Sequence, residues 1–150
     1  MFRGRYEHTL DGKGRLSVPS KFREVLLGKG DERIIITNFS LDGMHCLDVY
    51  PMEEWLHLED EMRKKPKFDP QMVVFQNYYI GSACECIVDK QGRILIPPPL
   101  RQYASLKRDA VFVGALEKFR VWDRETWEKS SVHAEDKFAQ DPNFLGNLGF

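Results

Sequence analysis

The chain has 150 residues, of which 42% are hydrophobic and 30% are charged, so its composition excludes a disordered chain and predicts a globular domain with its own core. No run of 18 apolar residues is present, which excludes a membrane-spanning helix, and the first ten residues lack the apolar stretch of a secretory signal. The formal net charge of −1, from 22 Lys and Arg against 23 Asp and Glu, does not by itself indicate a nucleic-acid-binding protein.

The expected secondary structure follows from alternating apolar residues, turn residues and helical spacing. Along the first part of the chain we expect strands at 6–10 and 16–18, a helix stopped by Gly28, strands at 33–37 and 46–50, and a helix around 55–62. A further helix is predicted at 71–79. The later part repeats the order, with strands at 84–88 and 94–96, a helix beginning near Pro99, strands at 110–116 and 119–122, and a helix around 127–138.

A nine-residue motif occurs twice in the sequence. Residues 11–19 read D-G-K-G-R-L-S-V-P and residues 89–97 read D-K-Q-G-R-I-L-I-P, so both fit D-x-x-G-R-x-x-x-P. Four fixed identities match a given starting point by chance about once in 10⁵. The same offset of 78 residues pairs Arg23 with Arg101. We infer a tandem duplication.

The order of elements contains no long crossover of the kind that a parallel sheet needs, so we predict a mainly β fold with peripheral helices. Each copy is too short to bury a hydrophobic core large enough for independent stability. We therefore expect the two pseudo-symmetric copies to interleave in one domain. The expected units are a first copy at 1–63, a linker and helix at 64–79, a second copy at 80–140 and a tail at 141–150 that frays.

No catalytic or metal-binding pattern stands out. Cys84 and Cys86 are separated by one residue, whereas zinc ligands are usually separated by two to four residues and accompanied by a second pair. The first copy has Tyr6 and His8 at these positions, which favours structural strand cysteines over a metal site. The motifs HExxH, GxSxG, GxGxxG and GxxxxGK[ST] do not occur. We therefore expect no enzyme, no metal, no cofactor and no small-molecule substrate.

Arg15 and Arg93 are the motif residues for which local geometry offers no explanation. The other fixed positions have structural explanations as turn-bonding side chains, left-handed turn glycines and strand-ending prolines, at Asp11 and Asp89, Gly14 and Gly92, and Pro19 and Pro97. An arginine at the end of a tight hairpin presents five donors in a planar fork that suits a phosphate or a guanine edge. Alternatively, each arginine forms a salt bridge with the motif aspartate and holds the turn together. The sequence leaves both interpretations open.

The distribution of charge is compatible with an anion-binding face near the first motif. Residues 1–30 hold seven basic and three acidic side chains, a local charge of +4, so the other 120 residues sum to −5. Lys13 lies inside the first motif and Lys90 inside the second. A basic face for an anionic partner and ordinary surface scatter both account for this asymmetry.

The paired motif resembles the MraZ family of bacterial transcriptional regulators, as do the opening Met1-Phe2-Arg3-Gly4 and the sequence Tyr50-Pro51 followed by Trp55. The likeness extends over residues 1–140. It implies the AbrB/SpoVT/MazE-like fold, in which swapped β-hairpins build a double-split barrel that binds DNA. It also implies a cytoplasmic, nucleoid-associated transcriptional regulator that binds double-stranded DNA sequence-specifically. Such a regulator acts as a repressor of the division and cell-wall gene cluster. Such a protein binds repeated promoter elements as a ring-shaped homo-oligomer.

The resemblance carries candidate DNA contacts onto this chain residue by residue. These candidates are Arg15 and Arg93, with Lys13 beside the first motif and, on position and charge, Arg3 and Arg5. The second copy has Gln91 in place of Lys13 and Ala83 in place of Arg5, so we expect the first motif to contribute more to binding. A competing hypothesis is a protein–protein adaptor whose arginine turns bind acidic partners. Salt-sensitive binding to duplex DNA with direct repeats separates the two.

Overall fold

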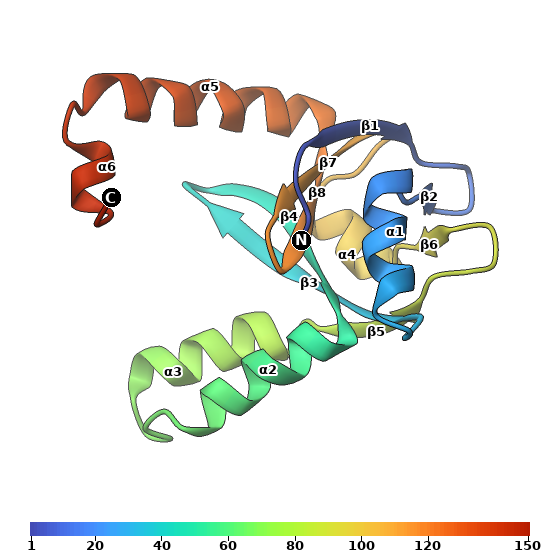
Figure 1. Cartoon of the computed structure of the whole chain (residues 1–150), viewed down its shortest axis with the longest axis horizontal. Helices are drawn as coiled ribbons and strands as arrows, with labels where there is room; N and C mark the ends of the chain where they lie inside the picture. Colours follow the sequence, from blue (N-terminus) through green and yellow to red (C-terminus); the bar gives the residue numbers. More distant parts are fainter.

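The computed structural model of the protein describes all residues from Met1 to Phe150 and shows the same order of elements twice (Figure 1). The first copy contains β1 (Arg5–Thr9), β2 (Arg15–Ser17), α1 (Ser20–Gly28), β3 (Arg33–Leu41), β4 (Met44–Pro51) and α2 (Met52–Arg63). The second copy contains β5 (Cys84–Ile87), β6 (Arg93–Leu95), α4 (Pro98–Tyr103), β7 (Asp109–Ala115), β8 (Lys118–Asp123) and α5 (Arg124–Gln140). Between them lie α3 (Pro70–Phe75) and the π-helix η1 (Gln76–Ile80), and α6 (Phe144–Asn147) follows α5.

All strand pairs are antiparallel, and the predicted mainly β fold with peripheral helices is confirmed. One sheet has six strands in the order β1-β7-β8-β4-β3-β5, and a second sheet consists of β2 and β6 alone. The six-stranded sheet is open, with β1 and β5 at its edges. No helix of the structure combines the length and the apolar character that crossing a membrane requires.

The two copies exchange strands. In the large sheet, β1 of the first copy pairs with β7 of the second, and β5 of the second copy pairs with β3 of the first. In the small sheet, β2 has β6 as its only partner, with Leu16 opposite Ile94. Neither motif strand therefore has a partner within its own copy, and each copy completes the other.

The main core lies beneath the small sheet and takes side chains from both copies. Leu16 and Ile94 are fully buried in it. Phe22 from α1 contacts Phe2 and Phe119, with ring centroids 5.3 and 5.1 Å apart. Because aromatic rings bury large apolar areas, these contacts between distant parts of the chain hold the exchanged strands in place.

The predicted helix at 71–79 is confirmed and extends from Pro70 to Ile80, changing from α to π geometry at Gln76. Its start has the expected capping pattern, because the Asp69 side chain accepts a hydrogen bond from the backbone N–H of Gln71 and Pro70 occupies the first turn. α2, α3 and η1 lie at the end of the molecule away from the motif turns (Figure 1), where the Trp55 ring of α2 stacks on the Tyr79 ring of η1 at a centroid distance of 5.9 Å.

A buried ionic network connects the linker to both copies. The Asp48 side chain on β4 is 1% exposed and accepts a hydrogen bond from Arg120 Nε on β8 at 2.8 Å. Its other carboxylate oxygen accepts from the hydroxyl of Tyr79 on the π-helix, and that hydroxyl is 2.8 Å from the hydroxyl of Tyr50. Burial raises the pKa of Asp48 above its usual value, against the opposing effect of Arg120.

Two local expectations differ from the structure. Helix α1 includes Gly28, and the left-handed residue that follows it is Gly30, with φ of 68°. The tail expected to fray forms the short helix α6, whose Phe144 ring contacts Phe138 of α5 at a centroid distance of 5.6 Å. An apolar contact with the preceding helix gives the tail an order that its glycines did not suggest.

Candidate nucleic-acid interface

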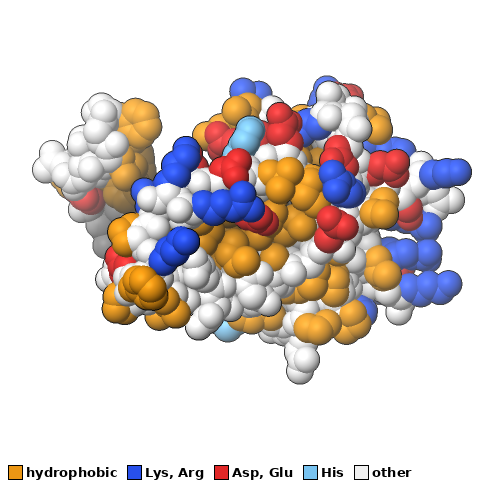
Figure 2. Space-filling model, turned by 90° about the horizontal axis from the view of Figure 1, so that it is seen from below, with side chains coloured by type: hydrophobic (Ala, Val, Ile, Leu, Met, Phe, Trp, Pro, Cys, Tyr) orange, Lys and Arg blue, Asp and Glu red, His pale blue; other side chains and the backbone are white.

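The two motif turns lie next to each other at one end of the molecule (Figure 1). This arrangement follows from the β2–β6 pairing, which sets Arg15 opposite Leu95 and Ser17 opposite Arg93. Lys and Arg side chains project from this same end in the space-filling view (Figure 2). The structure thus brings Arg15 and Arg93, 78 positions apart in the sequence, onto one two-stranded ribbon.

Each turn is closed by its aspartate and its glycine, as the sequence predicts. Asp11 Oδ1 accepts hydrogen bonds from the backbone N–H groups of Lys13 and Arg15, both at 2.9 Å. The N–H of Gly14 donates to the Asp11 carbonyl at 3.0 Å, and Gly14 has a φ of 84°, which a glycine adopts without strain. The second turn repeats these bonds from Gln91, Arg93 and Gly92 to Asp89.

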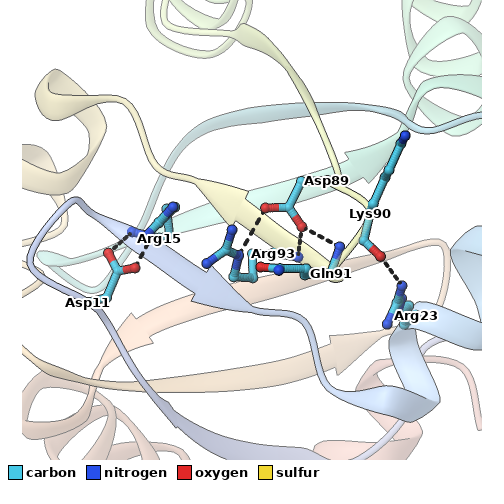
Figure 3. A network of polar contacts seen from close by, with 7 residues as sticks. All are labelled: Asp11, Arg15, Arg23, Asp89, Lys90, Gln91 and Arg93. Carbon is cyan, nitrogen blue, oxygen red and sulfur yellow. Dashed lines mark hydrogen bonds and ion pairs between the residues drawn. The ribbon is translucent and has the colours of Figure 1, made fainter.

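The motif arginines form the salt bridge that was one of the two interpretations. Arg15 Nε donates to Asp11 Oδ2 at 2.8 Å, and Arg93 Nε donates to Asp89 Oδ2 at 3.0 Å (Figure 3). The backbone N–H of Arg15, followed by its side chain, lowers the pKa of Asp11 to about 2, so this carboxylate is ionised at neutral pH.

The salt bridge leaves most of each guanidinium free. It uses Nε alone, the terminal nitrogens of Arg15 and Arg93 have no partner in the protein, and the two side chains are 30% and 29% exposed. A carboxylate that fixes Nε sets the plane of the guanidinium while its outer donors face solvent. The two interpretations of the arginines are therefore compatible, because the aspartate orients the group that an anion would meet.

Pro19 and Pro97 have a second role beyond ending the motif strands. Pro19 precedes α1 and Pro97 precedes α4, in each case as the N-cap residue. The carbonyl of Pro19 accepts from the N–H of Arg23 at 2.8 Å, and that of Pro97 accepts from the N–H of Arg101 at 3.0 Å. The motif therefore fixes where each helix starts relative to its turn.

Arg23 and Arg101 are residues of this region that the motif analysis did not select. Arg23 Nη2 donates to the carbonyl of Lys90 at 2.9 Å, across the boundary between the copies (Figure 3). The guanidinium of Arg101 packs on Gly14 in the equivalent place. Their match at the 78-residue offset was the signal available in the sequence, but nothing in the sequence indicated that each contacts the other copy's turn.

Comparison with known proteins identifies the family. The family model described as "MraZ protein, putative antitoxin-like" matches residues 1–77, which contain the first copy, and residues 79–145, which contain the second. The chain belongs to the MraZ family.

Relatives named "Transcriptional regulator MraZ" match the chain almost end to end. One from Desulfitobacterium hafniense (strain DSM 10664 / DCB-2) is 47% identical over 149 residues, which cover 99% of both chains. One from Lachnoclostridium phytofermentans is 44% identical over 146 residues, covering 97% of this chain and 98% of the relative. One from Syntrophobacter fumaroxidans is 40% identical over 148 residues, covering 99% and 96%. Membership of the MraZ family places the chain among transcriptional regulators.

Two of the candidates carried over from the MraZ resemblance lie away from the turns. Arg3 and Arg5 are exposed near the start of β1, whereas the first turn follows Thr9 at the other end of that strand. Four residues of strand separate Arg5 from Thr9 by about 13 Å. The guanidinium of Arg5 lies 5.6 Å from the centroid of the Trp127 ring on α5. The structure does not bring these two arginines together with Arg15.

The cysteines of this MraZ-family chain have different surroundings. Cys46 is fully buried, and burial raises the pKa of its thiol. Cys84 and Cys86 are half-buried on β5 and face the main core. No three His, Cys, Asp or Glu side chains converge in a way that would hold a metal ion.

Proposed function

We propose that this MraZ-family protein binds double-stranded DNA sequence-specifically through its two motif turns and thereby regulates transcription. The observation that carries the proposal is the pair of oriented guanidinium groups on one exposed β-ribbon. A two-stranded ribbon fits the major groove of B-DNA, and several regulators use one there. The lysines of the two turns, Lys13 and Lys90, are exposed and add positive charge to the turns.

The chemistry of the two arginines suits both parts of DNA recognition. The free terminal nitrogens of Arg15 or Arg93 match the O6 and N7 acceptors of guanine or two oxygens of a phosphate. A good bidentate contact to a base discriminates by about 1–3 kcal/mol, whereas a lysine contact to a phosphate adds affinity without sequence preference. We assign base contacts to the arginines and phosphate contacts to Lys13 and Lys90.

We further infer the double-split β-barrel of swapped hairpins as the architecture that presents the turns. Three exchanged pairings support it, β1 with β7, β5 with β3, and β2 with β6. In this arrangement the two copies act as fused halves of one DNA-binding unit.

We also propose that the protein acts as a ring-shaped homo-oligomer on promoter direct repeats. Each chain offers few cations, so repeating the same face several times raises its effective concentration on spaced DNA sites. Large exposed apolar side chains lie on the elements away from the turns, including Val74 on α3 and Val132 on α5, 67% and 60% exposed, and Phe150 in the tail, 88% exposed. Contacts between copies through these elements would leave the turns free.

The biological target follows from the family resemblance. We propose that the protein is a nucleoid-associated repressor of the division and cell-wall gene cluster. A chromatin pull-down from cells, followed by sequencing of the bound DNA, tests this. Enrichment of the promoter upstream of that cluster supports the proposal, and enrichment only at unrelated loci contradicts it.

The DNA-binding proposal is tested with fluorescently labelled duplexes that carry direct repeats from the promoter, and with scrambled duplexes. We expect salt-sensitive binding to the repeats and at least tenfold weaker binding for Arg15→Ala, with an unchanged melting temperature. Arg63→Ala at the end of α2 removes one exposed cation far from the turns and serves as the matched control. Undiminished affinity in a folded Arg15→Ala protein would refute the assignment.

Comparing Arg15→Ala with Arg93→Ala tests whether the turns contribute equally. The presence of Lys13 in the first turn and Gln91 in the second predicts the larger loss for Arg15→Ala. Equal losses at matched salt concentration would show that the two turns are equivalent and would contradict the charge argument.

A further inference from the structure

Each motif turn is in contact with an arginine from the opposite copy. Arg23 on α1 of the first copy reaches the second turn, where its Nη2 donates to the Lys90 carbonyl at 2.9 Å. A Cβ atom placed on Gly92 would lie 2.7 Å from Arg23 Nε, so the guanidinium packs directly on the backbone of this turn. Arg101 on α4 packs in the same way on Gly14, against the first turn. The contacts are reciprocal across the pseudo-two-fold relation of the copies.

Backbone hydrogen bonds between the two copies reach the same turn glycines. The N–H of Val18, at the end of the first motif, donates to the carbonyl of Gly92 at 2.8 Å. The N–H of Ile96, at the end of the second motif, donates to the carbonyl of Gly14 at 2.9 Å. Each turn glycine is therefore held by a backbone bond and a guanidinium that both come from the other copy.

The two arginines hold their turns with different strength. Arg23 adds a hydrogen bond from a charged donor to the packing contact. The side chain of Arg101 makes no hydrogen bond or ion pair, and its Nε is buried without a partner. We expect the second turn to depend more on Arg23 than the first turn depends on Arg101.

We propose that Arg23 and Arg101 are positioning residues that act crosswise, Arg23 on the turn that presents Arg93 and Arg101 on the turn that presents Arg15. The effect on DNA rests on the function proposed above, whereas the effect on the turns does not. Because each arginine belongs to the copy that carries the other motif, the two turns form one coupled unit. A substitution in one copy therefore alters the DNA-facing geometry of the other.

The positioning of the turns is measured without DNA, by backbone amide NMR of the free protein. Arg23→Ala should move the amide resonances of residues 90–93 more than those of residues 12–15, and Arg101→Ala should do the reverse. Arg63→Ala, with the same loss of charge, should move neither set. Shifts that stay within the substituted copy would overturn the proposal. Because this readout needs no DNA, it stands even if the protein proves not to bind DNA, a result that would defeat the proposed function alone.

Double variants test the crossing in DNA binding. Arg23→Ala should weaken binding about tenfold, the equivalent of about 1.4 kcal/mol. Added to Arg93→Ala it should cost no more than about a further twofold, since a turn that has lost its arginine gains nothing from being positioned. Added to Arg15→Ala it should keep its full tenfold effect, because that variant alters the other turn. A full tenfold effect on both backgrounds would overturn the proposal.

A conservative variant separates positioning from direct contact with phosphate. Arg23→Lys keeps the positive charge but lacks the flat guanidinium that packs on Gly92. We expect Arg23→Lys to bind DNA nearly as weakly as Arg23→Ala, with a melting temperature close to that of the unaltered protein. Restoration of full affinity by the lysine would identify Arg23 as a simple charge contact and overturn its positioning role.

Discussion

Removing Arg120 should strongly destabilise the protein, because the buried carboxylate of Asp48 then has no positive partner. The Asp48 side chain is 1% exposed and that of Arg120 is 26% exposed, with Nε and Oδ1 2.8 Å apart. Arg120→Met keeps much of the side-chain volume and removes the cation. Tyr79 still donates to Asp48, but a neutral hydroxyl does not replace a positive charge.

The expected loss is large and depends on pH. Breaking a buried ion pair by removing one partner typically costs about 3–5 kcal/mol. For a chain of this size each kcal/mol lowers the melting temperature by about 2–4 °C, which gives a decrease of about 6–20 °C. Burial already raises the pKa of Asp48, and loss of Arg120 raises it further. Since the folded state then binds a proton more readily than the unfolded state, the penalty is largest at neutral pH and shrinks as the pH falls.

Urea unfolding of Arg120→Met at pH 7.5 and at pH 5 measures both effects. Arg124→Met removes an exposed partner of Glu128 and serves as the control, with an expected change within about 0.5 kcal/mol. In the Asp48→Asn/Arg120→Met double variant no charge is buried, so part of the stability should return. A loss below about 1 kcal/mol for Arg120→Met at pH 7.5, or an equal loss at both pH values, would refute the reasoning.

Two further predictions concern the small sheet and its first turn. Leu16, fully buried opposite Ile94, should lose about 2–5 kcal/mol on replacement by alanine, whereas Leu95→Ala on the exposed side of the same ribbon should change stability by less than about 1 kcal/mol; thermal melting compares them, and equal losses would contradict the β2–β6 register. The carboxyl of Asp11, whose pKa is lowered to about 2 chiefly by the backbone N–H of Arg15, should still be ionised at pH 3 in a carbon-detected NMR titration. Because this pKa is depressed, the carboxylate supports the turn above about pH 4 and loses that role only as the pH falls through about 2; a midpoint near 4 would be incompatible with the hydrogen bonds to Asp11.

The order of the elements was predictable from the sequence, because local patterns determine it. Alternating apolar residues mark the strands, and Asp11 and Gly14 close their turn with bonds between neighbours. The identity of the strand partners was not predictable, since β2 is three residues long and pairs with a strand far along the chain. For the same reason the contact between Arg23 and the second turn was missed, because a helix surface position gives no sign of which distant loop it will meet.

Helix α5 shows that the spacing of apolar residues does not predict which residues of a helix are buried. The sequence predicts a helix around 127–138 from apolar residues such as Phe138 at helical spacing. In the structure Ser130 is the only buried residue of this helix, and Phe138 is 54% exposed. A pattern of spacing reports that a face is apolar and does not say which surface covers it.

The exclusive pairing of β2 with β6 also affects how the protein is made. Arg15 pairs with Leu95, so the first turn has no completed ribbon until 80 more residues have been synthesised. At elongation rates of about 5–20 residues per second this is a delay of about 4–16 s. During that interval the first copy exposes strands whose partners do not yet exist, and a neighbouring chain on the same messenger RNA offers equivalent ones. Truncated chains that end before β6 therefore lack the paired ribbon, and the competition between folding within a chain and exchange between chains is decided in the seconds before the second copy emerges.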